Sequence, residues 1–176
     1  MQKLHQFPPN FGITTFGRSL IKADLMEITE KFLTAIGYTG FASVEYKWNN
    51  ARGKYYLIEV NPRLPWYNGL FTSSNVNLPY IYYQDMKCTD EGGEFNSFMQ
   101  KENFYWMYFR NELAGYWKRK QAGKKDNLCK LIKALANTRS FAYWDKADPI
   151  PFVMANFEFF KWGASKIFKK DAKNVD

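Results

Sequence analysis

Residues 40–63 read GFASVEYKWNNARGKYYLIEVNPR, which is two alternating segments joined by a polar connection. Successive side chains of a strand lie on opposite faces, and both Phe41 to Trp48 and Tyr55 to Asn61 alternate in this way. The connection, residues 49–54, is rich in turn-forming residues, and Pro62 ends the second segment. The stretch therefore predicts a β-hairpin.

The register of this hairpin decides which side chains meet. A loop centred near Arg52 places Glu45 directly across from Glu59, and Ser43 across from Asn61. Two opposed carboxylates repel each other, so a shared proton, a nearby basic side chain or a bound cation must offset their charge. Two Glu and one Asn are hard oxygen ligands of the kind that Mg²⁺ or Mn²⁺ prefers.

Arg63 follows this strand directly and carries a planar guanidinium that can donate two hydrogen bonds to a phosphate. Together with the two carboxylates and Asn61 it predicts a site for a metal ion and the phosphates of a nucleotide. The alternative from spacing alone is that both Glu residues are exposed on a half-solvated sheet and pair with Lys47 or Arg52.

Residues 58–63, IEVNPR, resemble the metal-binding strand of the ATP-grasp superfamily, which includes biotin carboxylase, carbamoyl-phosphate synthetase and D-alanine–D-alanine ligase. Residues 36–41, IGYTGF, are similar to the helix end and strand start that precede the other metal-ligand strand of this superfamily. Glu45 matches the acidic or amide position on that strand.

The resemblance implies a site and a reaction. It implies that Glu45, Glu59 and Asn61 hold Mg²⁺ or Mn²⁺ ions that bridge the phosphates of ATP. It implies that Arg63 is catalytic and approaches the γ-phosphate or an acyl phosphate. In the family, ATP phosphorylates a small-molecule carboxylate, and an amine or another nucleophile attacks the acyl phosphate.

The resemblance extends over about residues 10–85, and residues 140–151 are more weakly similar to the tail of uncharacterised carboxylate–amine ligase-like members. It implies an α+β fold in which residues 1–95 form the C-terminal ATP-grasp subdomain, an antiparallel sheet with packed helices. Residues 96–176 are expected to form an aromatic, basic, mostly helical extension. The Gly-rich phosphate loop of the family is not found, so the chain is expected to be a fragment or to take the missing half from a partner chain. Lys47 also stands near a position that is apolar in many relatives, under the adenine.

Local signals predict the remaining elements. Asp24 with Glu27 three residues later resembles a capping box, and Gly37 ends the helix that follows. The other expected elements are a strand over 12–16, a short helix over 77–83, a strand (alternatively a helix) over 104–113, a basic amphipathic helix over 127–136 and, after a stiff break at 148–151, an amphipathic helix with an aromatic stripe over 153–167.

Composition excludes several classes of protein. The chain has 176 residues, 46% of them apolar, which excludes extended disorder, and it contains no apolar run of membrane-spanning length. No secretory signal peptide is expected at the N-terminus. Two cysteines, Cys88 and Cys129, cannot form a disulfide framework and indicate a reducing, cytoplasmic environment. With a single His, His5, both zinc binding and nucleophilic catalysis by cysteine are disfavoured.

The net charge of +8 and the aromatic content of 19% leave a second function open. In this alternative the chain is a non-catalytic nucleotide- or partner-binding module, and its basic aromatic tail contacts a membrane surface or a nucleic acid. A nucleic-acid partner is the less favoured of the two. Arg18 and Ser19 are further candidates for the substrate side of the cleft, with a plain surface pair as the alternative.

Overall fold

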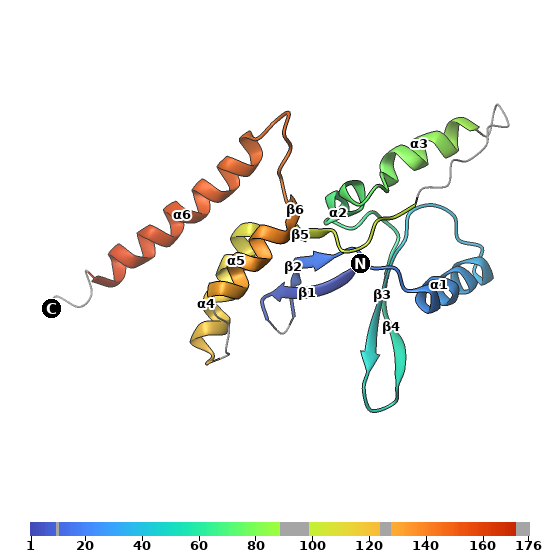
Figure 1. The fold of residues 1–176 in the computed structure, drawn as a ribbon, viewed down its shortest axis with the longest axis horizontal. Coiled ribbons are helices and arrows are strands. Elements are labelled where there is room, and N and C mark those ends of the chain that lie inside the picture. The colour runs from blue at the N-terminus through green and yellow to red at the C-terminus, as the bar shows by residue number, and fades with distance from the viewer. Residues whose placement is uncertain (10, 89–98, 124–127, 172–176) are drawn as a thin grey trace. The chain divides into compact units, whose positions relative to one another are not determined.

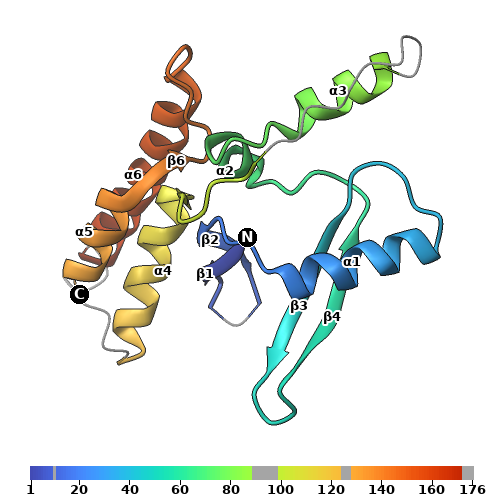
Figure 2. The ribbon, with the colours of Figure 1, turned by 45° about the vertical axis from the view of Figure 1, so that its right-hand side comes forward.

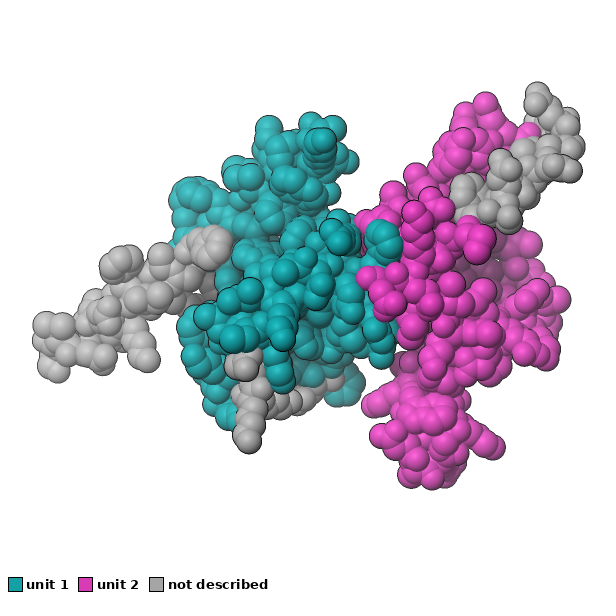
Figure 3. Space-filling model, in the orientation of Figure 1, with its two compact units in different colours: residues 1–18, 104–176 teal, residues 19–103 magenta. Residues whose placement is uncertain are grey.

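The computed structural model describes residues 1–9, 11–88, 99–123 and 128–171 and divides the chain into two compact units. Unit 1 comprises Met1–Arg18 and Phe104–Asp176, and unit 2 comprises Ser19–Asn103 (Figure 3). The boundaries of these units differ from the expected boundary between residues 95 and 96. That expected boundary stays a prediction. Among the residues that the structure describes, no helix combines the length and the apolar character needed to cross a membrane.

Unit 2 is built around the predicted hairpin, whose strands are β3 (Ser43–Asn49) and β4 (Lys54–Asn61). Helix α1 (Ala23–Ala35) lies beside this hairpin (Figure 2), and the hydroxyl oxygens of Thr29 and Tyr46 are 2.9 Å apart. Two further helices, α2 (Asn68–Ser73) and α3 (Leu78–Cys88), follow β4 (Figure 1). Unit 2 therefore consists of a two-stranded antiparallel sheet with α1 beside it and two further helices after it.

At the end of the hairpin away from its turn, the register is the predicted one. Ser43 pairs with Asn61 and Glu45 pairs with Glu59. A β-bulge follows, because Tyr46 pairs with Leu57 and Ile58 is left as an extra residue on β4. The turn between the strands is closed by hydrogen bonds from the Arg52 amide to the backbone and side chain of Asn49.

The start of α1 differs from the capping-box prediction, and its end agrees with prediction. The N-cap is Lys22, in an extended conformation and without a side-chain cap, and Asp24 lies in the first turn. There its carboxylate still complements the positive end of the helix dipole. Gly37 ends the helix at φ +63°, and the amide of Tyr38 donates to the carbonyl of Leu33 over 3.0 Å.

Helix α3 begins where the sequence predicts but continues five residues beyond the expected end at Tyr83. The side-chain oxygen of Asn77 accepts a hydrogen bond from the amide of Tyr80 over 3.2 Å, which caps the helix, and Pro79 lies in the first turn. Helix α2 was not predicted. Its Leu70 and the adjacent Ser74 are fully buried and form the centre of unit 2.

Unit 1 contains a four-stranded sheet in the order β1-β2-β5-β6. The pairs β1–β2 and β2–β5 are antiparallel, whereas β5–β6 is parallel. Gly12 is required beside the β1–β2 turn, because a Cβ there would lie 2.2 Å from the carbonyl carbon of Phe7. The strands are β1 (Gln2–Phe7), β2 (Ile13–Arg18), β5 (Tyr105–Met107) and β6 (Thr138–Phe141), of which β2 was predicted.

The strand preferred over 104–113 is wrong for most of its length. It is a strand only over Tyr105–Met107, and α4 (Phe109–Gln121) begins two residues later. The buried residues Glu112, Gly115 and Tyr116 follow helical spacing, which decides the helix once the sheet supplies a surface to pack on. Helix α5 (Leu128–Asn137) matches the helix predicted over 127–136, although Asn127 lies outside the described residues. Helix α6 (Ile150–Asp171) includes the helix predicted over 153–167, but it is longer at both ends and begins inside the break expected over 148–151.

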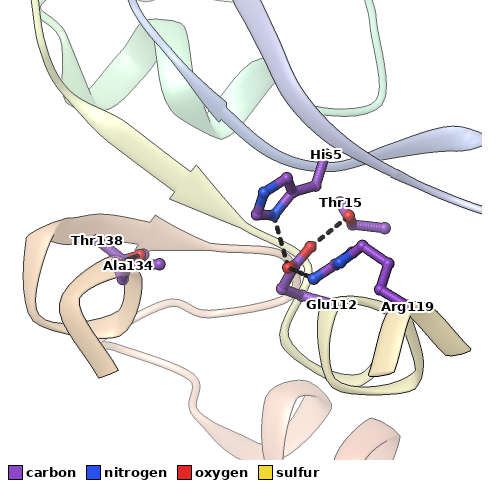
Figure 4. Close-up of polar contacts among 6 residues, drawn as sticks. All are labelled: His5, Thr15, Glu112, Arg119, Ala134 and Thr138. Atoms are coloured by element: carbon purple, nitrogen blue, oxygen red, sulfur yellow. Dashed lines mark hydrogen bonds and ion pairs between the residues drawn. The ribbon is translucent and has the colours of Figure 1, made fainter. Parts of the chain in front are cut away.

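The carboxylate of Glu112 ties these elements together inside unit 1 (Figure 4). Its Oε1 lies 2.7 Å from Nδ1 of His5 on β1 and 2.7 Å from Nη2 of Arg119 on α4. Its Oε2 accepts a 2.5 Å hydrogen bond from the hydroxyl of Thr15 on β2. Burial by itself would raise the pKa of Glu112, but His5, Thr15 and Arg119 outweigh it and hold the pKa below its usual value. His5 therefore has a structural role in unit 1.

The fold class is α+β, as predicted. The two sheets are not one continuous antiparallel sheet, because the short strand β6 pairs in parallel with β5 and the hairpin β3–β4 forms its own sheet.

Candidate functional site

The predicted acidic pair meets on one face of the β3–β4 hairpin. Glu45 is directly across from Glu59, and Asn61 is two residues further along the same strand and so on the same face. Glu45 and Asn61 are half-buried, and Glu59 is exposed. The hairpin thus brings two carboxylates and one amide together without using any element other than itself.

Helix α1 contacts the other face of the hairpin. Tyr46, which bonds to Thr29 of α1, is the neighbour of Glu45 on β3, so their side chains lie on opposite faces. The face that carries Glu45, Glu59 and Asn61 is therefore the one turned away from α1.

The β-bulge separates the acidic end of the hairpin from its loop end. Beyond it Lys47 pairs with Tyr56, so Lys47 lies one position along the same face from the acidic pair. Both Lys47 and Tyr56 are exposed, and the phenol of Tyr56 accepts a 3.1 Å hydrogen bond from Arg52. Bulges are frequent beside functional sites, where they re-aim side chains. Because it donates to Tyr56, the Arg52 guanidinium has a partner other than the Glu residues with which spacing alone would pair it.

Arg63 leaves the hairpin through a tight turn. Its amide donates to the carbonyl of Asn61 over 2.8 Å, and its Nη1 lies 3.4 Å from the carbonyl of Leu64. The side chain is exposed. Arg63 is therefore held at the end of β4, next to Asn61, with its guanidinium accessible to a solvent-borne anion.

The structure adds Tyr67, which sequence reasoning missed. It lies four residues after Arg63, is 8% exposed, and packs its ring 6.0 Å from that of Phe71. Burial raises the pKa of Tyr67, a hydrogen bond with the Ser43 hydroxyl and the charge of Arg63 act in the opposite direction, and the charge of Glu45 raises it further. The phenol therefore lies among Ser43, Glu45 and Arg63. The sequence signal for Tyr67 was an aromatic residue shortly after the Asn-Pro-Arg motif. Only the turn through Pro65, seen in the structure, shows that this residue lies beside the hairpin.

The oxygen atoms of Glu45, Glu59 and Asn61 are of the type that binds Mg²⁺. The described residues contain no group of three or more His, Cys, Asp or Glu that could hold a metal ion, so a transition-metal centre of that sort has no support there. Mg²⁺ needs fewer protein ligands, because it keeps several waters and is bound through one or two carboxylates together with substrate phosphates. Glu45 opposite Glu59, with Asn61 beside them, meets that requirement.

Ser19 does not line a cleft. It is fully buried, and its hydroxyl donates to the carbonyl of Lys101 over 2.7 Å. Arg18 donates from Nε to the side chain of Gln2 over 2.7 Å. Neither contact supports a role on the substrate side, and the burial of Ser19 also excludes the alternative of a plain surface pair.

Comparison with known proteins agrees with the family resemblance that the hairpin sequence carries. Residues 2–79 match the family model described as the carbamoyl-phosphate synthase L chain, ATP binding domain. A segment of 65 residues is 37% identical to acetyl-CoA carboxylase 2 of Oryza sativa subsp. japonica and covers 36% of this chain. The chain spans about 3% of the length of that relative, and no solved structure gives a significant match.

The matched segment contains every residue of the site. It begins at residue 2, eight residues before the resemblance noted in the sequence, and it includes β1, β2, α1 and the whole β3–β4 hairpin. Residues 2–79 of this chain are therefore similar to the ATP-binding domain of the carbamoyl-phosphate synthase L chain, which agrees with the ATP-grasp resemblance of the hairpin.

Proposed function

We propose that the β3–β4 hairpin binds the phosphates of Mg–ATP and that the complete protein is a carboxylate–amine type ligase. The observation that carries the proposal is the direct pairing of Glu45 with Glu59, with Asn61 on the same face, inside a segment that matches an ATP-binding domain. Under this proposal residues 1–95 form the nucleotide-binding part and residues 96–176 an extension, in a cytoplasmic protein.

Each residue has a role that follows from its position. Glu45, Glu59 and Asn61 would hold Mg²⁺ or Mn²⁺, which when bound neutralises charge on the transferring phosphoryl group. Arg63, accessible at the end of β4, would donate hydrogen bonds to the γ-phosphate and to the acyl phosphate of the small-molecule carboxylate. Phosphoryl transfer to a carboxylate requires little general acid or base catalysis, which suits a site built from carboxylates, an amide and a guanidinium.

The site is tested by calorimetric titration of Mg–ATP into the chain and into the Glu59→Ala, Asn61→Ala double variant. The matched control is Glu30→Ala, Asn50→Ala, which removes the same residue types from exposed positions of α1 and the hairpin turn. Binding is expected in the wild type and the control and lost in the double variant. Equal binding by all three proteins, or no binding by the wild type, would contradict the assignment of the site to this chain.

A further inference from the structure

Helix α6 is apolar on more than one side. Phe152 packs edge-on against Phe141, with ring centroids 5.8 Å apart, and against Trp144 at 5.4 Å. Ala155 and Phe159 follow it at helical spacing and are half-buried. This stripe attaches the first half of α6 to the rest of unit 1.

A second stripe on α6 is exposed, and we call it the outer stripe. Its members recur at the spacing of one helix face and are apolar without exception. A contiguous exposed apolar face on a helix marks a candidate contact surface. The outer stripe consists of Ile150, Val153, Met154 and Phe157, which are exposed by 67%, 57%, 51% and 51%.

Charge is divided unequally between the two units. Unit 1 contains 17 Lys and Arg against seven Asp and Glu, a formal net charge of +10. Unit 2 contains eight basic and ten acidic residues, a net charge of −2. The outer stripe therefore belongs to the unit that carries the whole positive excess of the chain.

Basic side chains also accompany exposed rings in unit 1. The ammonium of Lys161 lies 4.7 Å from the ring centroid of Phe157, one helical turn away in the outer stripe. On α4, Lys120 lies 5.5 Å from the ring of Trp117, which is also exposed. A long basic side chain beside an exposed ring can keep its charge in a polar layer while its stem and the ring enter an apolar one.

We propose that the outer stripe of α6 docks unit 1 onto an anionic lipid bilayer surface. An apolar stripe with aromatic and aliphatic members, on a strongly basic unit, has the composition of a helix that lies in the membrane interface. The aliphatic members distinguish this partner from a nucleic acid, which offers aromatic residues a stacking surface but offers Ile150, Val153 and Met154 nothing comparable. Tyr143 and Trp144, exposed just before the helix, are residue types that favour the same interface.

The test uses the full chain and vesicles of phosphatidylcholine alone or with about 30% phosphatidylserine. The test variant is Val153→Gln, Phe157→Gln, which leaves the net charge unchanged. The matched control is Met26→Gln, Ile28→Gln, two exposed apolar positions on α1 in unit 2. All four positions are exposed, so each variant is expected to retain the far-UV circular dichroism of the wild type.

The wild type is expected to sediment with the phosphatidylserine vesicles and only weakly with phosphatidylcholine. The stripe variant should bind at least about tenfold more weakly, and the control variant as tightly as the wild type. Raising NaCl to about 1 M, where the Debye length is about 3 Å, should weaken but not abolish binding.

Three results would overturn the proposal. The first is no binding of the wild type to phosphatidylserine vesicles. The second is an equal loss in the stripe and control variants, which indicates unspecific adsorption of exposed apolar residues. The third is binding of a single-stranded oligonucleotide that is unaffected in the stripe variant while vesicles are not bound, which indicates a nucleic-acid surface instead. None of these readouts depends on nucleotide binding by the hairpin.

Discussion

At the scale of single residues, the direct pairing of Glu45 with Glu59 on the hairpin has consequences for stability that can be measured. Glu45 and Glu59 face each other across the strands, so without a bound cation their charges oppose the pairing. Replacing one of the pair should therefore change stability and metal binding in opposite directions.

We predict that Glu59→Gln stabilises the protein by about 0.2–1 kcal/mol in buffer containing EDTA, because it removes a cross-strand repulsion. The same change should remove the paramagnetic broadening that Mn²⁺ causes at the amides of β3 and β4 in the wild type. Urea unfolding and NMR spectroscopy measure the two effects, with Glu30→Gln as the control. Destabilisation without any change in Mn²⁺ broadening would mean that Glu59 is a structural surface residue.

A second prediction concerns the buried phenol of Tyr67. Tyr67→Phe keeps the ring that packs on Phe71 but removes the hydrogen bond with Ser43. We expect a loss of about 0.5–1.5 kcal/mol in the free energy of unfolding.

A double-mutant cycle of Tyr67→Phe with Ser43→Ala tests whether Ser43 is the hydrogen-bond partner of Tyr67. The double variant should lose less free energy of unfolding than the sum of the two single variants. Tyr55→Phe, on the same hairpin, is the control for loss of a phenol oxygen. Strict additivity in the cycle would show that the two hydroxyls do not act together.

At the scale of elements, the buried carboxylate of Glu112 joins β1, β2 and α4. Three donors from three elements satisfy both of its oxygens. Removing one partner of a buried charged network leaves the others desolvated without compensation, so Glu112→Ala should cost about 3–5 kcal/mol. Of the strands that the sequence missed in unit 1, β1 contributes to this network through His5.

The charge of Glu112 should also make unit 1 sensitive to acid. Its pKa in the folded protein lies below the usual value of 4.5, so the stabilisation from its charged form is present above that pH. The stabilisation is lost as the pH falls through the lowered folded-state pKa. We predict that acid lowers the urea midpoint of the wild type over about pH 5 to 3 and that this slope is smaller in Glu112→Gln. Parallel pH profiles for the two proteins would exclude the network as its source.

At the scale of the whole molecule, each compact unit has its own buried centre. Trp106 and Met107 are buried in unit 1, and Leu70 and Ser74 in unit 2. Separate cores favour separate opening reactions. We predict that Glu112→Ala lowers hydrogen-exchange protection in β1, β2, β5 and β6 and leaves β3 and β4 at the wild-type level. An equal loss of protection in the β3–β4 hairpin would show that the chain opens as one cooperative unit.

The sequence predicted the elements whose signals are local. The alternating segments and the polar connection of the hairpin, the glycine that ends α1, and the turn residues before α6 each act within a few neighbouring positions. The pairing of Glu45 with Glu59 followed from the same local geometry, and so did the proximity of Asn61 and Arg63. The ATP-grasp resemblance, which comparison with known proteins supports over residues 2–79, rests on this same stretch.

Tertiary contacts decided the features that local signals left open. Strands β5 and β6 are only three and four residues long, and they form because β5 pairs with the distant strand β2 and β6 pairs with β5. Position 109 begins a helix because buried contacts recur at helical spacing from Glu112 onward, and Tyr67 enters the site because the chain turns back after Arg63. The arrangement of the hairpin residues could thus be predicted from the sequence, because these residues are close along the chain. The buried network and the exposed stripe of α6 could not, because burial is a property of the assembled fold.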